Sequence, residues 1–239
     1  MPTALVTGAS AGLGRALAAA LVTHQWTVIG TGRDTAALSA AAREAGFTAM
    51  PGDVTDSAHR ASLAEACPSL DLLVNNASSL GVSPLPPLAR YPLADLEDVY
   101  RVNVFAPLAL TQLLLPALTA ARGVVIDVSS DAAVEAYEGW GGYGSAKAAL
   151  DQLTAVLGVE HPDLSVYAVD PGDLRTAMHQ RAFPGEDISD RPLPETAVPA
   201  FLRLLDERPP SGRYRAADLL SIHAPTATLD GGAARPEFS

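Results

Sequence analysis

The sequence has few of the features that mark disulfide-stabilised, nucleic-acid-binding or membrane proteins. Its one cysteine, Cys67, cannot form an intramolecular disulfide, which fits a reducing cytoplasm. Lys and Arg number 16 against 27 Asp and Glu, and no basic cluster is present to bind nucleic-acid phosphates. No apolar run approaches ~18 residues and the N-terminus lacks a basic segment, so we expect neither a membrane span nor a signal peptide.

What the sequence does contain is an alternation of short apolar strands and helical segments, in a chain long enough for one well-buried domain. Alternation of this kind favours a parallel sheet covered by helices on both faces. Two stretches, 78–92 and 175–194, break the pattern and are predicted to be irregular. Strands are predicted at 3–7, 26–31, 47–50, 70–75, 123–129, 164–169 and 213–217, and helices near 13–23, 34–45, 57–66, 94–118, 143–159 and 195–206.

A glycine-rich segment, TGASAGLG, follows the first predicted strand and leads into the first predicted helix. Gly8 permits backbone angles that other residues resist, Gly12 leaves room for a diphosphate, and Gly14 permits close packing of the helix on the sheet. The free N–H groups at the helix N-terminus attract phosphate. A glycine signal in this strand-to-helix context therefore predicts a dinucleotide site.

Tyr143 and Lys147 are separated by four residues, so in a helix their side chains share one face. A positive charge beside a phenol favours the phenolate and lowers its pKa from about 10. Such a tyrosine can exchange a proton with an alcohol or carbonyl oxygen, and the hydroxyl of Ser130 could polarise the same oxygen.

Taken together, the motifs resemble the short-chain dehydrogenase/reductase family. The matches are Thr7-Gly8-x-x-x-Gly12-x-Gly14, Asp53-Val54, Asn75-Asn76-Ala77, Asn103, Ser130, Tyr143-x-x-x-Lys147 and Pro171-Gly172. The resemblance implies an α/β fold: a single-domain, Rossmann-type, doubly wound sheet of seven parallel strands in the order 3-2-1-4-5-6-7, with helices on both faces. It also implies one dinucleotide-binding domain over 1–239, a substrate-covering segment at about 175–195, a C-terminal tail at 219–239, and a homodimer or homotetramer.

The resemblance implies a nicotinamide cofactor. The position that often carries an acidic residue in NAD-selective enzymes is Gly32, and Arg33 follows it, which favours NADP(H) over NAD(H). If Asp34 held the ribose instead, NAD(H) would be preferred. Asp53 would bond the adenine amino group and Thr176 the carboxamide or the pyrophosphate. The implied cofactor contacts are Thr7, Gly8, Ser10, Gly12, Leu13, Gly14, Arg33, Asp53, Val54, Asn75, Ala77, Tyr143, Lys147, Pro171, Gly172 and Thr176.

The implied catalytic residues are Asn103, Ser130, Tyr143 and Lys147, with no metal. Tyr143 would be the general acid in carbonyl reduction and the general base in alcohol oxidation, while a hydride passes to or from C4 of the nicotinamide. Lys147 would lower the Tyr143 pKa and bond the nicotinamide ribose, and Asn103 would help a water chain reach Lys147. Further residues could contact an apolar or planar substrate: Tyr137, Trp140, Met178, His179 and Phe183.

Two rival interpretations remain open. One is a nucleotide-sugar epimerase or dehydratase, which the short stretch after residue 195 disfavours because such relatives carry a C-terminal substrate lobe. The other is a catalytically silent NADP-sensing protein, which the intact catalytic residues disfavour. We expect a small-molecule carbonyl or alcohol as the partner, and neither nucleic acid nor a membrane.

Overall fold

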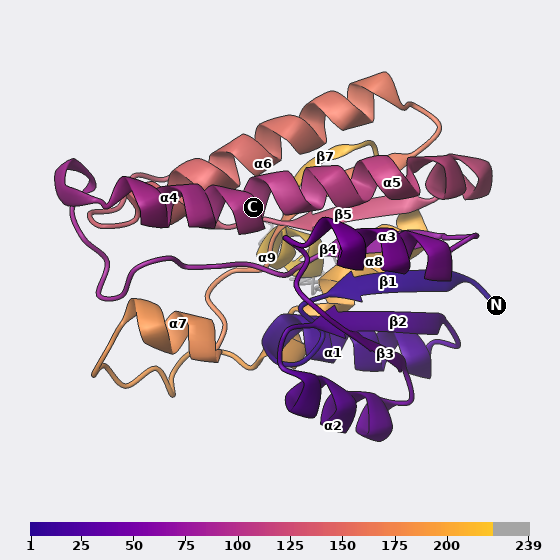
Figure 1. The fold of residues 1–239 in the computed structure, drawn as a ribbon, viewed down its shortest axis with the longest axis horizontal. Helices are drawn as coiled ribbons and strands as arrows, with labels where there is room; N and C mark the ends of the chain where they lie inside the picture. Colours follow the sequence, from indigo (N-terminus) through magenta and orange to yellow (C-terminus); the bar gives the residue numbers. More distant parts are fainter. Residues whose placement is uncertain (222–239) are drawn as a thin grey trace, which may run out of the picture.

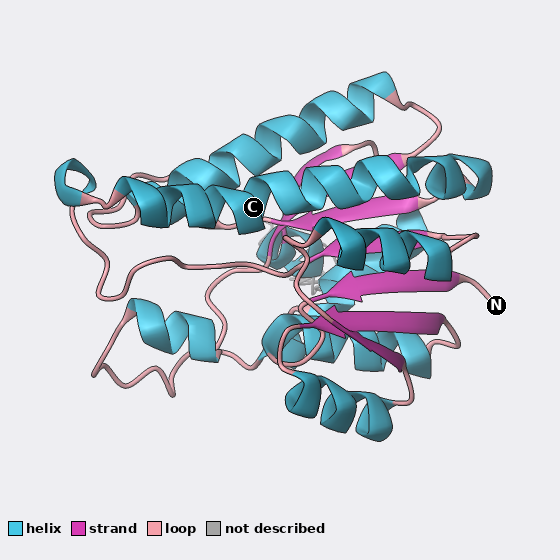
Figure 2. Cartoon of the chain, viewed as in Figure 1, coloured by secondary structure: helices cyan, strands magenta, loops and turns pink. Residues whose placement is uncertain are grey.

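The computed structural model describes residues 1–221, which contain a seven-stranded parallel sheet in the order β3-β2-β1-β4-β5-β6-β7 (Figures 1 and 2). The predicted strand order is confirmed. The chain reverses direction across the sheet between β1 and β4, which pair directly. The strands are β1 (Thr3–Thr7), β2 (Thr27–Gly32), β3 (Thr48–Pro51), β4 (Leu72–Asn75), β5 (Val124–Val128), β6 (Ser165–Asp170) and β7 (Gly212–Arg215).

Helices cover both faces of the sheet, and alternate residues of each strand face one layer or the other. On β1, Leu5 belongs to the core beneath α3 and α5, whereas Ala4 and Val6 belong to the core beneath α1, α2 and α8. Each large apolar side chain buried in this way contributes about 1.5–3 kcal/mol. The helices are α1 (Gly12–Thr23), α2 (Thr35–Ala45), α3 (Ser57–Ala66), α4 (Leu93–Tyr100), α5 (Ala106–Ala121), α6 (Gly141–Glu160), α7 (Ala177–Ala182), α8 (Val198–Glu207) and α9 (Ala216–Ser221).

The predicted helix at 94–118 is longer and less regular than expected. A π-helical turn over Arg101–Phe105 joins α4 to α5, so the chain is helical from Leu93 to Ala121. By length and composition this stretch could cross a membrane, although the core helix of a soluble protein meets the same criteria, and 39% of its most apolar window is buried. The expected absence of a membrane span therefore stays a prediction.

Two short helices were not predicted from the sequence. α7 lies inside the stretch 175–194, and α9 follows β7 directly, where the predicted strand extended to residue 217. Each contains six residues, fewer than two helical turns, so neither gives a readable apolar period. α9 occupies the start of the predicted tail at 219–239, and residues 222–239 lie outside the described part of the chain.

Candidate active site

A cavity of about 450 Å³ opens at the carboxyl ends of the strands, where the strand order reverses. Ligands of open α/β sheets bind at this place. Figure 1 shows the loop before α4 and the segment around α7 projecting beyond the same edge. The lining comes from the β1–α1 turn, the ends of β2 to β6, the start of α6 and α7.

The β1–α1 turn is shaped by glycines with left-handed backbone angles. Gly8 has φ 68° and Gly12 has φ 54°. A Cβ atom at Gly8 would lie 2.6 Å from Nδ2 of Asn76, which donates hydrogen bonds to the carbonyl oxygens of Thr7 (2.9 Å) and Gly8 (3.3 Å). At Gly12 a Cβ would meet only the side chain of Thr176, across the cavity. The turn thus leaves space for a diphosphate beside the α1 N-terminus.

Three implied cofactor contacts, Thr7, Gly14 and Asn75, are not part of the cavity lining. The Thr7 hydroxyl accepts hydrogen bonds from the backbone N–H groups of Asn76 and Ala77, both at 2.9 Å. Gly14 packs against the backbone of the β1–α1 turn. These residues shape the cofactor site from behind rather than facing it.

Asn75 is buried beneath the site and its side chain is committed to the sheet. Its Nδ2 donates to Oδ1 of Asp127 at 2.8 Å and to the Thr111 hydroxyl at 3.2 Å. Asn76, which the sequence analysis did not single out, lines the cavity instead. Both asparagines belong to the same motif, so the motif alone did not show which of them faces the cavity. Side chains alternate between the two faces along a strand, and this alternation could have shown it.

The far end of the cavity carries the residues expected to distinguish NADP from NAD. Ser10, Gly32 and Arg33 line it, and a Cβ at Gly32 would lie 3.2 Å from the Ser10 hydroxyl oxygen, so a longer side chain would crowd this corner. The Arg33 side chain is 70% exposed. Asp34 also lines the cavity, and one of its carboxylate oxygens caps α2 by accepting a hydrogen bond from the N–H of Ala37 at 2.9 Å.

Asp53 and Val54 line the same end of the cavity, beside Arg33. One carboxylate oxygen of Asp53 accepts from the N–H and the hydroxyl of Thr55, both at 2.8 Å, and the other lies 4.0 Å from the Arg33 guanidinium. Burial raises the pKa of Asp53, but the Thr55 hydrogen bonds and the Arg33 charge outweigh it and hold this pKa below its ordinary value. Asp56, three residues further on, caps α3.

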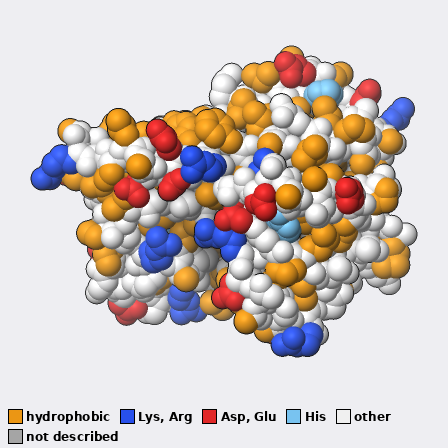
Figure 3. Space-filling model, in the orientation of Figure 1, with side chains coloured by type: hydrophobic (Ala, Val, Ile, Leu, Met, Phe, Trp, Pro, Cys, Tyr) orange, Lys and Arg blue, Asp and Glu red, His pale blue; other side chains and the backbone are white. Residues whose placement is uncertain are grey.

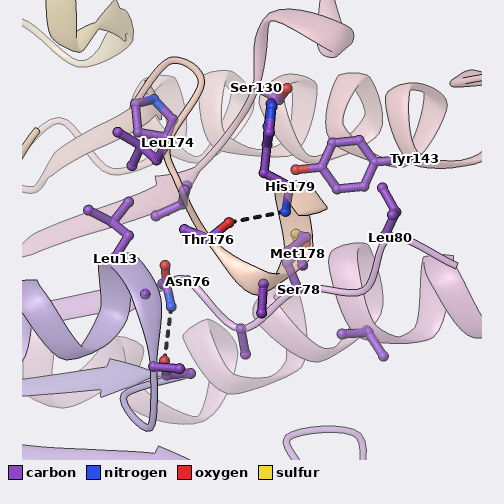
Figure 4. Close-up of a pocket in the computed structure, with 18 of the residues that line it drawn as sticks. Leu13, Asn76, Ser78, Leu80, Ser130, Tyr143, Leu174, Thr176, Met178 and His179 are labelled. Carbon is purple, nitrogen blue, oxygen red and sulfur yellow. Dashed lines mark hydrogen bonds between the residues drawn. The ribbon is translucent and has the colours of Figure 1, made fainter. Parts of the chain in front are cut away.

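The other end of the cavity holds the phenol of Tyr143 and the ammonium of Lys147 on the first turns of α6. Both residues are buried, at 8% and 1% exposure. The Lys147 Nζ donates to the carbonyl oxygen of Val128 at 2.6 Å and lies 5.6 Å from the centre of the Tyr143 ring. Figure 4 shows the Tyr143 hydroxyl directed into the cavity, with Ser130 and His179 nearby.

Burial dominates the proton affinities of this pair. It raises the pKa of Tyr143 to about 12, although the neighbouring hydroxyls of Ser78 and Ser130 act to lower it. Burial also lowers the pKa of Lys147 to about 8, opposed by the charges of Asp127 and Asp151. Burial thus acts against the predicted lowering of the Tyr143 pKa, because it disfavours the charged phenolate. The lowering of this pKa by Lys147 stays a prediction.

Ser130 is placed by the residue that follows it. Its hydroxyl donates to Oδ1 of Asp131 at 2.9 Å, and the other oxygen of Asp131 accepts from the Tyr137 hydroxyl, also at 2.9 Å. Asp131 thus aligns Ser130 at the cavity wall and ties down the loop that leads to Trp140. The sequence analysis missed Asp131.

Asn103 lies in the π-helical turn between α4 and α5, outside the cavity lining. Its Oδ1 accepts from the N–H of Ser79 at 2.8 Å and from the Ser78 hydroxyl at 3.1 Å, while its Nδ2 donates to the Ser79 carbonyl oxygen at 2.8 Å. A π-helical turn inside a helix frequently marks a functional site. In the structure Asn103 fixes the loop after β4; its role in a water chain stays a prediction.

The segment around α7 covers the substrate end of the cavity. The Thr176 hydroxyl caps α7 by accepting from the N–H of His179 at 3.1 Å (Figure 4). Met178 and His179 line the cavity, whereas Phe183 packs behind them against Trp140, with ring centres 6.0 Å apart. Pro171 and Gly172, at the start of the segment, also line the cavity.

The covering segment is closed at its base and joined to a second loop. The N–H of Arg175 donates to the carbonyl oxygen of Pro192 at 2.8 Å, which closes the base. The Ser83 hydroxyl donates to the carbonyl oxygen of Arg181 at 2.6 Å, and the Arg181 guanidinium donates to the Gly81 carbonyl oxygen at 3.3 Å. The two stretches predicted to be irregular, 78–92 and 175–194, are therefore joined by hydrogen bonds and form one wall of the cavity.

A phosphate-binding turn, a nucleotide-sized cavity and a buried tyrosine–lysine pair in one site define an oxidoreductase that uses a dinucleotide. Comparisons with known proteins agree. The family model "short chain dehydrogenase" matches residues 2–187. The chain therefore belongs to the short-chain dehydrogenase family and is an NAD(P)-dependent oxidoreductase acting on CH–OH or C=O groups.

Relatives with known names and structures cover most of the chain. Serine 3-dehydrogenase of Rhizobium radiobacter is 37% identical over 183 residues, which are 73% of this chain and 72% of that enzyme. A benzil reductase of Saccharomyces cerevisiae that forms (S)-benzoin is 30% identical over 242 residues, 94% of this chain and 87% of the other. The crystal structure of a short chain dehydrogenase from Shigella flexneri 2a, complexed with NADP, has a TM-score of 0.83 at 31% identity and covers 90% of this chain and 97% of its own.

Proposed function

We propose that this protein is an NADPH-dependent carbonyl reductase for apolar or aromatic ketones, with Tyr143 as the proton donor. One observation carries the proposal: the Tyr143 phenol and the Lys147 ammonium line the same cavity as the glycine turn. A protein that only sensed the cofactor would need no proton donor at the substrate end. The catalytically silent alternative is therefore the outcome that an activity assay must exclude.

The residues present fit NADP(H). Gly8, Gly12 and Leu13 would hold the diphosphate, Asp53 and Val54 the adenine, and Ser10 with Arg33 the 2′-phosphate, because all of them line one continuous cavity. Asp34 also lines the cavity, but it follows Arg33 and one of its carboxylate oxygens caps α2, so Arg33 is the better placed partner for this end of the cofactor. The NADP complex of the Shigella relative supports the same choice.

In the proposed reduction the cofactor supplies a hydride to the carbonyl carbon. Tyr143 donates its proton to the carbonyl oxygen, and the raised pKa keeps the phenol protonated, and so ready to donate, across the neutral range. Ser130, aligned by Asp131, holds the same oxygen. Lys147 has a pKa of about 8 and can pass a proton onward near neutrality. Leu174 and the α7 segment would shield these groups from water.

The walls near Tyr143 indicate the substrate class. Leu80, Trp140, Met178 and Ala182 line the cavity there and belong to one apolar cluster with Tyr143. Asp131 and Asp173 are the acidic residues on the same side, so an anionic substrate would be repelled. The apolar cluster favours a ketone such as benzil, the substrate in the name of the yeast relative, over a polar zwitterion such as serine.

The test is an assay of NADPH oxidation at 340 nm with benzil, together with NADP⁺ reduction in the presence of L-serine. We expect turnover with benzil that disappears in Tyr143→Phe and persists in Tyr214→Phe. Tyr214 provides the control because its hydroxyl donates to the Pro210 carbonyl oxygen and it does not line the cavity. Cofactor binding without any carbonyl reduction across a wider ketone series would refute the reductase and favour the silent sensor.

The same proposal includes an assembly and a location. Large hydrophobic side chains are exposed on the α4–α5 helix and on α6: Leu93, Phe105, Leu113, Val156 and Val159. Figure 3 shows hydrophobic side chains on the α4 and α5 side of the molecule. Such a surface supports a homodimer or homotetramer built through these helices. The buried free thiol of Cys67 agrees with a cytoplasmic protein.

Light scattering after size exclusion tests the assembly. Phe105→Glu, which places a charge on the exposed helix face, should lower the measured mass to that of one chain, about 24.7 kDa. Leu88→Glu serves as the control, because Leu88 is equally exposed, at 64% against 59%, but lies in the loop before α4. Equal masses for wild type and Phe105→Glu would place any interface elsewhere.

A further inference from the structure

Arg213 on β7 joins the elements that carry the active-site groups. Its Nε donates to Oδ2 of Asp151 on α6 at 2.9 Å, and its Nη2 donates to the carbonyl oxygen of Ser130 at 2.9 Å. The same Nη2 lies 3.4 Å from Oδ2 of Asp170 at the end of β6. One guanidinium therefore contacts the ends of β5 and β6 and the helix between them.

Each partner leads directly to a group at the reacting end of the cavity. Asp151 follows Lys147 by one helical turn, so Tyr143, Lys147 and Asp151 form one stripe along α6. The Ser130 carbonyl belongs to a residue of the cavity lining whose hydroxyl, in the proposed function, holds the substrate oxygen. Asp170 is 96% buried, and its other oxygen accepts from the N–H of Gly172 at 3.0 Å, in the turn that lines the cavity.

We propose that Arg213 is a positioning residue of the reductase site, which holds Ser130, the α6 stripe and the Asp170 turn together and neutralises the buried carboxylate of Asp170 and the partly buried carboxylate of Asp151. Arg213 lies beyond residues 2–187, the part of the chain that the family model matches. None of the motifs in the sequence analysis includes it. The proposal rests on the proposed function for its effect on catalysis, but not for its effect on Lys147.

The electrostatic consequence has a definite sign. The groups that act on Lys147 are Asp127 from β5 and Asp151 from α6, and both favour the charged ammonium. Those that act on Tyr143 include Asp131 and Asp170, which disfavour the phenolate. Arg213 is paired with Asp151 and Asp170, one carboxylate from each set. Its removal would leave both negative charges uncompensated and raise the pKa of Lys147 and of Tyr143.

The chain permits a direct measurement because Lys147 is its only lysine. A protein labelled with ¹³C at lysine Cε gives one side-chain resonance, whose pH titration reports Lys147 without any substrate. In Arg213→Gln we expect this titration to move to higher pH. In Asp151→Asn, which removes the carboxylate instead, it should move to lower pH. Arg215→Gln is the control, since it has the same charge change on the same strand at an exposed position.

Catalysis provides the second readout. With saturating NADPH and benzil, Arg213→Gln should lower kcat on the order of 10- to 100-fold, the scale of a sub-ångström to ångström misplacement of reacting groups. The dissociation constant for NADPH should change by less than about threefold, since Arg213 does not line the cavity. Thermal melting confirms that each variant is folded, and Asp151→Asn provides the titration readout if Arg213→Gln does not fold.

The outcomes separate the two proposals. If the wild type reduces no ketone but the Lys147 resonance shifts in opposite directions in Arg213→Gln and Asp151→Asn, the reductase is refuted and the role of Arg213 stands. If ketone reduction is present while Arg213→Gln matches Arg215→Gln in titration and in kcat, the reductase stands and the role of Arg213 is refuted. Shifts of the same sign in both variants would also refute it, because they indicate a general loosening of α6.

Discussion

Replacing Arg33 by alanine should change which cofactor the protein prefers. In the structure the Arg33 guanidinium lies at the cavity end opposite the catalytic pair, beside Ser10 and Gly32. If it binds the 2′-phosphate, Arg33→Ala weakens NADPH and leaves NADH unchanged, because NADH has a hydroxyl in place of that phosphate.

The expected rise in the NADPH dissociation constant follows from the exposure of the Arg33 side chain and from the competing carboxylate of Asp53. A hydrogen bond to a charged group contributes about 1.5–3 kcal/mol. The Arg33 side chain is 70% exposed and the Asp53 carboxylate, 4.0 Å away, competes for it, so we take the lower limit. About 1.5 kcal/mol corresponds to roughly a tenfold rise in the dissociation constant. The change should shrink at high salt, because exposed charges are screened.

Thermal shift and fluorescence titration with NADPH and NADH measure this directly. At an NADPH concentration of a hundred times the wild-type dissociation constant, a tenfold weaker variant loses about 1.3 kcal/mol of ligand-induced stabilisation. Arg15→Ala is the control, because Arg15 is also on this side but pairs with Glu44 at 2.7 Å. Equal losses for NADPH and NADH, or no loss for NADPH, would refute the assignment of Arg33.

Three further predictions concern the catalytic pair and the layer beneath it. Tyr143→Phe should lower turnover by about 10²–10⁴-fold while the NADPH dissociation constant stays within a few-fold, and near-normal turnover would refute its role as proton donor. Because burial lowers the pKa of Lys147 from 10.5 to about 8, the unfolded chain binds more protons between these values, so the free energy of unfolding should rise with pH there. Chemical denaturation of wild type and Lys147→Met over this range tests the sign, since the rise should be absent from the variant. Asn75→Leu should cost about 1–3 kcal/mol by leaving Asp127 without one of its buried donors, measured by urea unfolding, and a variant as stable as wild type would contradict the role given to that hydrogen bond.

The sequence predicted the sheet well because its central strands are short apolar runs between turn residues. β5, for example, reads VVIDV and is buried throughout. The strand order came from the resemblance, since periodicity does not determine how strands are arranged. The α7 and α9 helices were missed because six residues provide too little apolar repeat to recognise.

The sequence predicted which motifs form the site better than it predicted which of their side chains face the cavity. A motif marks residues that shape a turn as well as residues that face a ligand, so Thr7 and Asn75 were grouped with the cofactor contacts although their side chains bond to the protein. The direction of the Tyr143 pKa depends on burial, which spacing alone does not give. Arg213 was missed because its partners become its neighbours only after folding. Asp131 was missed although it adjoins Ser130 in the sequence, because it belongs to none of the motifs.

The closed base of the α7 segment has a consequence for how such enzymes diversify. The two ends of this stretch meet at one backbone hydrogen bond, from the Arg175 N–H to the Pro192 carbonyl oxygen, so its sequence can change with little effect on the sheet. The hydrogen bonds of Arg181 with Ser83 and Gly81 couple the stretch to the loop before α4, so the two should change together. Chimaeras that transplant both stretches together should acquire the donor's substrate range and keep the host's coenzyme. Chimaeras that transplant only one stretch should not, because the donor stretch would contact a host stretch with a different sequence.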